Sequence, residues 1–330
     1  MIKKIIYTVV LTASVGVCAF AQTPSPMPTP QMPPRVSPTP AIGLETILSE
    51  AEKQTVKYRE TFTDLLAIET KTFEKFGKSG ETKDKTVIES NFFVYQSSKD
   101  GKTSSELRNV IKVDDEPVPE SQARADRFLA ELQKTSTVEK ELEKIQDEGL
   151  RYDNTFKISG LTLFEAIALF DNLRSVFDFK LLGTETYQGR EVYVVTYQQT
   201  RKSPFITVNE KKSKLQGIKA DYDVSLPGSL KKTNTFLRGK LWIDAQTFQI
   251  WREERQLAVQ TAAPVVAQET VFEYQPSEYE ILVPKKITFT ENNLKKTNGN
   301  EFSATKNTRV SFDYSKFRKT SVDVQIIDEP

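Results

Sequence analysis

The sequence has no histidine, and its only cysteine and its three methionines all fall within the first 32 of its 330 residues. Zinc, copper, haem and iron–sulfur sites depend on histidine, thiolate or thioether ligands, which the rest of the chain does not contain. Catalysis by Ser-His-Asp or Cys-His groups is excluded for the same reason. We therefore expect no metal, no cofactor and no catalytic residue, and a protein that binds rather than an enzyme.

An excess of charge of one sign is also missing, because 46 Lys and Arg residues balance 45 Asp and Glu residues. A balanced chain has no overall attraction to nucleic acid or to anionic lipid. We therefore expect no nucleic-acid partner. Without a cysteine after residue 18, an exported chain would also fold without disulfides and depend on its core alone.

The N-terminus has the pattern of a secretory signal peptide over residues 1–21. Two lysines precede the apolar run Ile5–Val17, and Ala19-Phe20-Ala21 supplies an A-x-A cleavage site. The apolar run is too short to span a bilayer stably. We expect export to the periplasm with cleavage after Ala21. The alternative is a lipid anchor on Cys18, although the valine before this cysteine fits a lipoprotein signal poorly.

Residues 22–43 contain eight of the chain's sixteen prolines and are predicted to be a disordered linker. As extended polyproline II at about 3.1 Å per residue, this linker would reach roughly 60–70 Å. If Cys18 were lipidated, the linker would tether a receptor to a membrane. If the signal is cleaved after Ala21, the protein is released and could carry a cargo.

Residues 44–318 are predicted to form the folded domain, with a helical insertion at 117–175, a polar excursion at 202–232 and a C-terminal tail at 319–330. Apolar residues at helical spacing predict a first helix over Leu44–Arg59. Within the insertion, Leu163–Leu173 is apolar nearly all round, which predicts a buried helix that covers a sheet.

The remaining segments alternate with turn signals and predict strands. They are Thr61–Phe76, Lys85–Gln96, Ser104–Val113, Phe177–Thr186, Arg190–Gln199, Phe236–Asp244, Phe248–Gln260, Glu269–Tyr274, Ile281–Thr290 and Phe302–Tyr314. Short connections between so many strands predict an α+β fold with one large antiparallel sheet that curls. Several strands are apolar on both faces, so we expect both faces to be covered or to enclose something.

Three stretches of strand, tight turn and strand occur together in the second half. They are Leu182–Val195; Gly239–Asp244 with Ile250–Glu254; and Leu282–Ile287 with Val310–Tyr314. Together they resemble the bacterial outer-membrane lipoprotein carrier and localisation-factor superfamily and its related periplasmic regulators that bind anti-sigma factors. Over Leu44–Lys316 this resemblance implies an unclosed half-barrel, with helices over the concave face and a cavity that binds acyl chains or lipidated proteins.

A carrier of this kind needs apolar side chains around its cavity and a lid that shields them from water. We expect Trp242, Trp251, Tyr193 and Tyr197 to line the cavity, and Leu163–Leu173 to be the lid. Within the lid, the residues expected to contact the ligand are Phe164, Ile167 and Phe170. The alternative for each of these residues is ordinary packing in the core or at the surface.

The sequence contains only weak matches to catalytic motifs. Ser303–Lys306 and Ser229–Lys232 have the S-x-x-K spacing, but they fall in a predicted strand and a polar loop rather than at a buried helix start. Glu253-Glu254 and Asp114-Asp115-Glu116 are adjacent acids, which point to opposite faces of a strand and are expected to be solvated.

These patterns leave three functions. The first is a lipid- or lipoprotein-binding carrier, and the second an envelope-stress sensor or interaction module that binds a membrane-anchored protein. The third is a carboxylate-based hydrolase, which needs two acidic side chains facing each other about 5–10 Å apart in a cleft.

Overall fold

The computed structural model describes residues 42–63, 65–96, 104–134, 138–153, 158, 160–163, 165–210, 219–297 and 301–319. The predicted signal peptide and nearly all of the proline-rich linker lie outside the described residues. So do Phe164 and residues 320–330 of the predicted tail.

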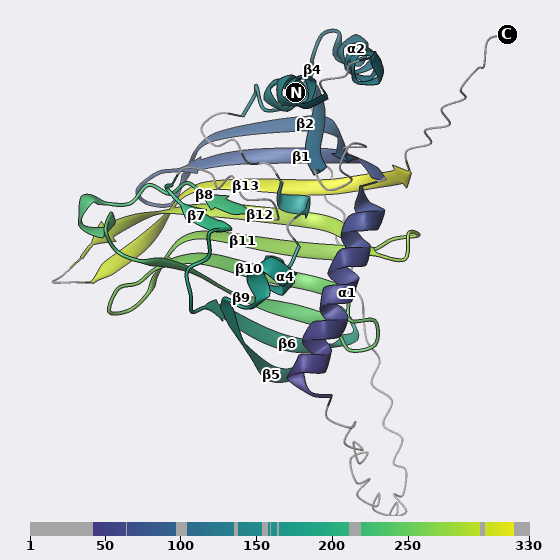
Figure 1. Cartoon of the computed structure of the whole chain (residues 1–330). Helices are drawn as coiled ribbons and strands as arrows, with labels where there is room; N and C mark the ends of the chain where they lie inside the picture. The colour runs from purple at the N-terminus through teal and green to yellow at the C-terminus, as the bar shows by residue number, and fades with distance from the viewer. Residues whose placement is uncertain are drawn as a thin grey trace, which may run out of the picture. The chain divides into compact units, whose positions relative to one another are not determined.

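Among the described residues, eleven strands form one antiparallel sheet in the order β4-β3-β2-β1-β13-β12-β11-β10-β9-β6-β5 (Figure 1). Their bounds are β1 Leu65–Phe76, β2 Thr82–Gln96, β3 Ser104–Val113, β4 Glu116–Pro117, β5 Phe177–Tyr187, β6 Arg190–Gln199, β9 Thr235–Asp244, β10 Ile250–Val259, β11 Val265–Pro276, β12 Leu282–Lys296 and β13 Phe302–Lys319. Because β4 and β5 do not pair with each other, the sheet stays open. The predicted α+β fold with an unclosed antiparallel sheet is confirmed.

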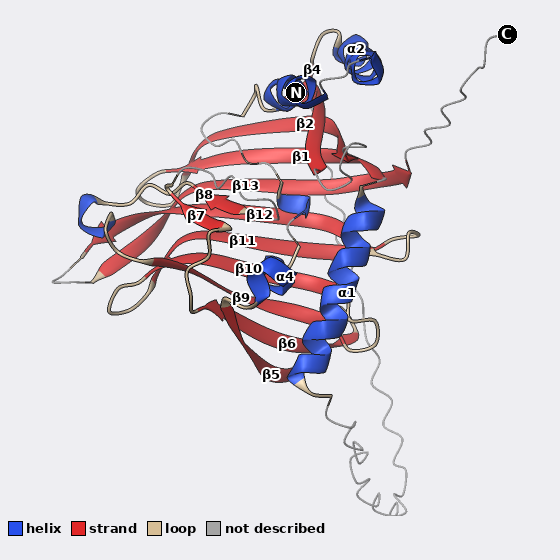
Figure 2. Cartoon of the chain, in the orientation of Figure 1, coloured by secondary structure: helices blue, strands red, loops and turns tan. Residues whose placement is uncertain are grey.

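One face of the sheet, which we call the inner face, is buried under the rest of the chain. Helix α1, Leu44–Phe62, lies across the strands on this face (Figure 2). Tyr58 of α1 meets Tyr274 edge to face at 6.1 Å between ring centroids, and Phe62 meets Phe92 at 6.3 Å. Along β1, every second residue from Leu65 to Phe73 is buried, which is the alternation of a strand with one covered face.

A segment that we call the inner segment, residues 160–163 and 165–173, also lies on this face. The predicted helix over Leu163–Leu173 is wrong: the chain forms two 3₁₀ turns, η1 Leu161–Leu163 and η2 Ile167–Leu169, and the four-residue helix α4, Asp171–Arg174. Ala166 has φ 44°, in the left-handed region, which no helix continues through. Its N–H donates to a carboxylate of the sheet instead of to a helical carbonyl. Tertiary contacts therefore override the helical pattern.

The predicted burial of this segment is nevertheless correct. The side chains of the inner segment that pack against the sheet and α1 are each 4% exposed or less, namely Ile167, Ala168, Leu169, Phe170 and Leu173. Helices α2, Ser121–Lys134, and α3, Val138–Gly149, lie instead at the β3–β4 end of the sheet (Figure 1).

The predicted polar excursion is only partly polar. It contains two short parallel strands, β7 Ile206–Val208 and β8 Ala220–Tyr222, and a 3₁₀ turn, η3 Gly228–Leu230. We call residues 202–210 and 219–232 the arm. The arm contacts the inner face, where the Gln268 side chain of β11 donates a hydrogen bond to the backbone carbonyl of Asp223. Across the described residues, no helix has the length and apolar character needed to cross a membrane.

Candidate functional site

The inner face is filled with the chain's own side chains. The register places Lys71, Phe312, Ile287, Phe272, Glu253 and Leu241 in one row across six strands of this face. Beside the inner segment, a pocket lined by Tyr58, Glu165 and Leu282 has a volume of about 10 Å³. That is room for one water molecule and not for a ligand.

Buried polar side chains of the inner face and α1 hold the inner segment in place. Glu106 accepts hydrogen bonds from the N–H groups of Gly160 at 2.7 Å and Thr162 at 2.8 Å, and from the Thr162 hydroxyl at 2.6 Å. The Tyr58 hydroxyl donates to the Thr162 carbonyl at 2.8 Å. Irregular backbone in a core must find such partners, because an unpaired buried N–H or C=O is costly.

The first group of buried charges centres on Arg108. Its guanidinium donates to both carboxylate oxygens of Glu69, at 2.7 and 2.8 Å, and to Glu106 at 3.0 Å. The Tyr314 hydroxyl adds a bond to Glu69 at 3.0 Å. Burial alone would raise the pKa of Glu69, but the adjacent Arg108 holds it below its usual value. Next to this group, Lys71 forms a buried ion pair with Asp153 at 2.8 Å.

The second group of buried charges lies on β10. Arg255 donates to both oxygens of Glu253, at 2.9 and 2.7 Å, and the Tyr197 hydroxyl donates at 2.6 Å. Glu253 also accepts the N–H of Ala166 at 2.9 Å, which attaches the inner segment a second time. Burial, and then the nearby charge of Glu253, raise the pKa of Glu165 well above its usual value.

The expectation that Glu253 and Glu254 are solvated is wrong for Glu253, which is fully buried. The two side chains do point to opposite faces, as predicted for a strand. Glu254 lies on the opposite face, the outer face, where it accepts from Arg252 at 2.9 Å. Sequence could not show that the face bearing Glu253 is covered, because segments far away in the chain cover it.

The structure brings some of the predicted ligand residues together. Tyr197 lies on the inner face, as does Tyr193, which stacks on Phe248 at 6.3 Å. Ile167 and Phe170 belong to the inner segment on the same face, and Phe164 lies outside the described residues.

The two tryptophans lie elsewhere. Trp242 is on the outer face, where the ammonium of Lys240 lies 4.3 Å from its ring centroid and its indole N–H donates to Glu185. The indole N–H of Trp251 donates to Asp244 at 3.0 Å, beside Arg190.

The buried charges were missed at the level of the sequence, although a signal was present. Glu69 and Lys71 occupy the same alternating positions of β1 as the apolar residues Leu65, Ala67 and Phe73. Charged residues in phase with the apolar side of a strand must be buried with it, and buried charges are paired.

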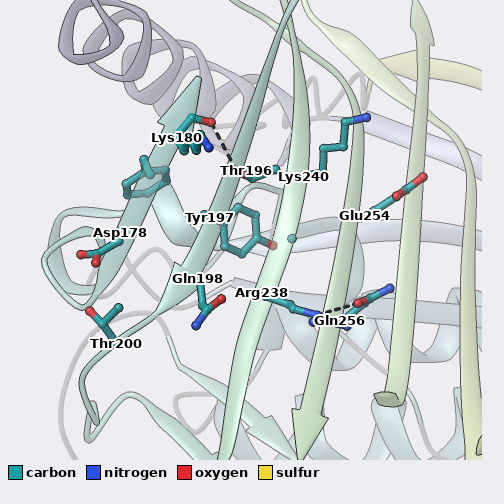
Figure 3. A pocket seen from close by; sticks show the side chains of 12 residues that line it. Asp178, Lys180, Thr196, Tyr197, Gln198, Thr200, Arg238, Lys240, Glu254 and Gln256 are labelled. Atoms are coloured by element: carbon teal, nitrogen blue, oxygen red, sulfur yellow. Dashed lines mark hydrogen bonds between the residues drawn. The ribbon is translucent and has the colours of Figure 1, made fainter. Parts of the chain in front are cut away.

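A groove of about 520 Å³ runs over the outer face beside β5 (Figure 3). Residues from β5, β6, β9 and β10 line it, namely Asp178, Phe179, Lys180, Thr196, Tyr197, Gln198, Thr200, Arg238, Gly239, Lys240, Glu254 and Gln256. Arg238 donates to Gln256 at 2.9 Å within it. A third pocket, of about 420 Å³, lies near the arm and is lined by polar residues that include Lys75, Asp223 and Glu291.

Gly239 allows the Tyr197 ring to reach Glu253 across β9. A Cβ at position 239 would overlap the Tyr197 ring and the Glu254 carbonyl oxygen. We therefore expect Gly239→Ala to lower the free energy of unfolding by about 1–3 kcal/mol, as overpacking in a core does. Gly228→Ala is the control, because a Cβ there meets no atom within 4 Å. Equal denaturation midpoints for the two variants would contradict this role.

The described residues contain no cluster of three or more metal-binding side chains of the His, Cys, Asp and Glu types. No protein-family model matches the chain, and no curated protein matches it.

Several solved structures are similar to it. One is a domain from Vibrio parahaemolyticus described as an outer-membrane lipoprotein-sorting protein, at 12% identity and a TM-score of 0.39, covering 84% of this chain and 94% of that one. A DUF1329-family protein from Desulfovibrio piger matches at 10% identity with a TM-score of 0.38, covering 83% of this chain and 94% of its own. A LolA-superfamily protein from Nitrosomonas europaea matches at 9% identity with a TM-score of 0.31, covering 88% of this chain and 99% of its own.

By their descriptions, the first and third of these structures fall in the lipoprotein-carrier group that the strand motifs resemble. At TM-scores below 0.4, the similarities carry no argument about function.

Proposed function

We propose that this chain is a non-enzymatic binding protein of the cell envelope that takes the acyl chain of a lipid or of a lipidated protein onto the inner face of its sheet. The observation that supports this proposal is the inner segment. It is apolar, irregular and buried, and it lies where the ligand of a half-barrel carrier would lie.

An acyl chain could replace the inner segment without disturbing the sheet. The segment contributes no strand, and polar groups such as Glu106, Glu253 and Tyr58 attach it at separate points. Its other polar contacts with α1 are a side-chain hydrogen bond between Asp171 and Glu52 and the Arg59 guanidinium over the Phe170 ring. The side chains of Ile167, Leu169 and Leu173 make apolar contacts. An acyl chain offers the same kind of contact and gains about 0.8 kcal/mol for each methylene buried.

The inner segment also explains how the empty protein would stay soluble. A bare concave sheet would expose a large apolar patch and promote association. With Ile167, Leu169 and Phe170 packed against it, that surface is covered until a ligand displaces them. Export is inferred from residues 1–21 and the linker that follows.

Binding can be tested with a fluorescent fatty acid and by native mass spectrometry of protein purified from its own host. We expect lipid to co-purify, and we expect Tyr58→Phe to bind the fatty acid about fivefold more tightly. This change removes the bond from Tyr58 to Thr162 and so weakens closure by about 1 kcal/mol.

Tyr279→Phe is the matched control, because it removes a hydroxyl bond to Phe317 that does not hold the inner segment. Unchanged affinity in Tyr58→Phe would show that the segment does not cover the site. If no lipid co-purifies and neither variant binds fatty acid, the carrier function is wrong.

An interaction module for a membrane-anchored protein is the second candidate. It is favoured by the edge of β5, which pairs only with β6 in the part of the chain that the structure describes. A carboxylate hydrolase has less support. Glu165 and Glu253 are neighbouring acids, but the pocket beside Glu165 holds about 10 Å³ and admits no substrate.

A further inference from the structure

Strand β5 is the last strand of the sheet and pairs only with β6 among the described residues. The carbonyls of Val176 and Lys180 point toward β6, where they accept from the Thr200 N–H at 2.9 Å and the Thr196 hydroxyl at 3.3 Å. Backbone groups alternate in direction along an antiparallel strand. The N–H and C=O groups of Phe177, Phe179 and Leu181 therefore point away from β6, toward the open edge.

This edge differs from the opposite one. At the other end of the sheet, β3 pairs with the two-residue strand β4, and helix α3 packs against β3. Along β5, a bulge between Leu181 and Gly183 interrupts regular pairing, as protective bulges at sheet edges do. The stretch from Phe177 to Leu181 precedes the bulge and is a regular template for an added strand.

The groove beside this edge has an excess of positive charge. Lys180, Arg238 and Lys240 face two carboxylates, Asp178 and Glu254. Glu254 is already ion-paired with Arg252 at 2.9 Å. Lys180 and Asp178 are both on β5 and next to any added strand, so the excess of positive charge comes from Arg238 and Lys240 on β9, two strands further in (Figure 3).

From the open edge and this charge, we propose that β5 binds an extended acidic peptide segment of a protein partner as an added strand along Phe177–Leu181. Backbone hydrogen bonds would hold the segment, and acidic side chains on its outer face would lie beside Lys180. Lys240 and Arg238 would add to the attraction through their field, which acts over about 10 Å at moderate ionic strength. This site is separate from the inner face and does not depend on acyl-chain binding.

The probe is a ten-residue peptide in which glutamate alternates with valine or threonine, compared with the same peptide carrying lysine in place of glutamate. Fluorescence anisotropy at low salt with the full chain should show that the acidic peptide binds at least about tenfold more tightly. We expect Lys180→Glu to weaken binding about tenfold and Lys240→Glu to weaken it by less. Lys285→Glu, an exposed change on β12 outside the groove, should leave binding unchanged.

Amide hydrogen exchange tests the geometry directly. The bound peptide should slow exchange of the backbone amides of Phe177, Phe179 and Leu181, and not of backbone amides in the strands away from this edge. Binding without this protection, or equal binding of the lysine peptide, would overturn the proposal. The proposal would also be overturned if phosphatidylglycerol vesicles competed with the peptide for this site. Fatty-acid binding is measured separately, so failure here leaves the carrier function standing.

Discussion

Replacing Arg108 with methionine is expected to lower the free energy of unfolding by about 3–5 kcal/mol, as removal of one partner from a buried ion network does. The guanidinium is fully buried and donates to Glu69 and Glu106. Without it, the carboxylates of Glu69 and Glu106 stay in the core and lose the positive charge to which they are hydrogen-bonded. Because Glu106 also holds Gly160 and Thr162, the inner segment should loosen in the same variant. Urea denaturation measures the loss of stability.

Two controls separate this effect from the simple loss of a positive charge. Arg309→Met breaks an ion pair with Glu74 at the outer surface and should cost about 0–1 kcal/mol. Combining Arg108→Met with Glu69→Gln and Glu106→Gln removes the stranded charges and should recover part of the stability. A loss below about 1 kcal/mol in Arg108→Met would show that the buried network contributes little.

The second large effect is a fall in stability as the pH rises above about 5, caused by Glu165. Burial and the nearby charge of Glu253 raise the pKa of Glu165, so the folded protein keeps a proton that the unfolded chain releases. Tyr58, Tyr274 and Arg255 are the other titratable groups close to these two acids. The stabilisation from Glu165 is complete when the pH is below 4.5, the pKa of this group in the unfolded chain. It is lost as the pH rises toward the higher pKa of the folded chain. The slope reaches about 1.4 kcal/mol per pH unit.

Glu165→Gln should abolish this dependence, because an amide has no proton to release. Measured between pH 5 and pH 8, the stability of the variant relative to the native chain should increase with pH. The lowered pKa of Glu69 acts in the opposite direction, with its stabilisation lost only as the pH falls below 4.5. Glu254→Gln on the outer face is the matched control. Parallel stability curves for Glu165→Gln and the native chain would rule out this role.

Much of the fold follows from local patterns in the sequence. Strands such as β3, β6 and β12 were predicted from alternating side chains between turn residues, and α1 from its helical spacing. These patterns are local, because a strand repeats every two residues and a helix every 3.6. The number of strands predicts the large antiparallel sheet, and its unclosed form is what the resemblance carried by motifs such as those around Gly239 and Leu282 implies.

The candidate site was predicted less well. Tyr193, Tyr197, Ile167 and Phe170 share the inner face, but Trp242 lies on the outer face, since a tryptophan in a strand suits either side of a sheet. The inner segment was expected to be helical, but Ala166 bonds Glu253 instead of continuing a helix.

By itself, the sequence determined the chemistry that the chain lacks, the strands and α1, and the pattern of an export signal. The absence of histidine and late cysteine decides the missing chemistry in any conformation. Only the tertiary structure decided which face of the sheet is covered, and therefore that Glu253 and Arg108 are buried while Glu254 and Trp242 face outward. The reason is physical: α1 meets the sheet and helix α4 through contacts between residues more than a hundred positions apart in the chain, such as Tyr58 with Tyr274 and Glu52 with Arg174. No local pattern records such contacts.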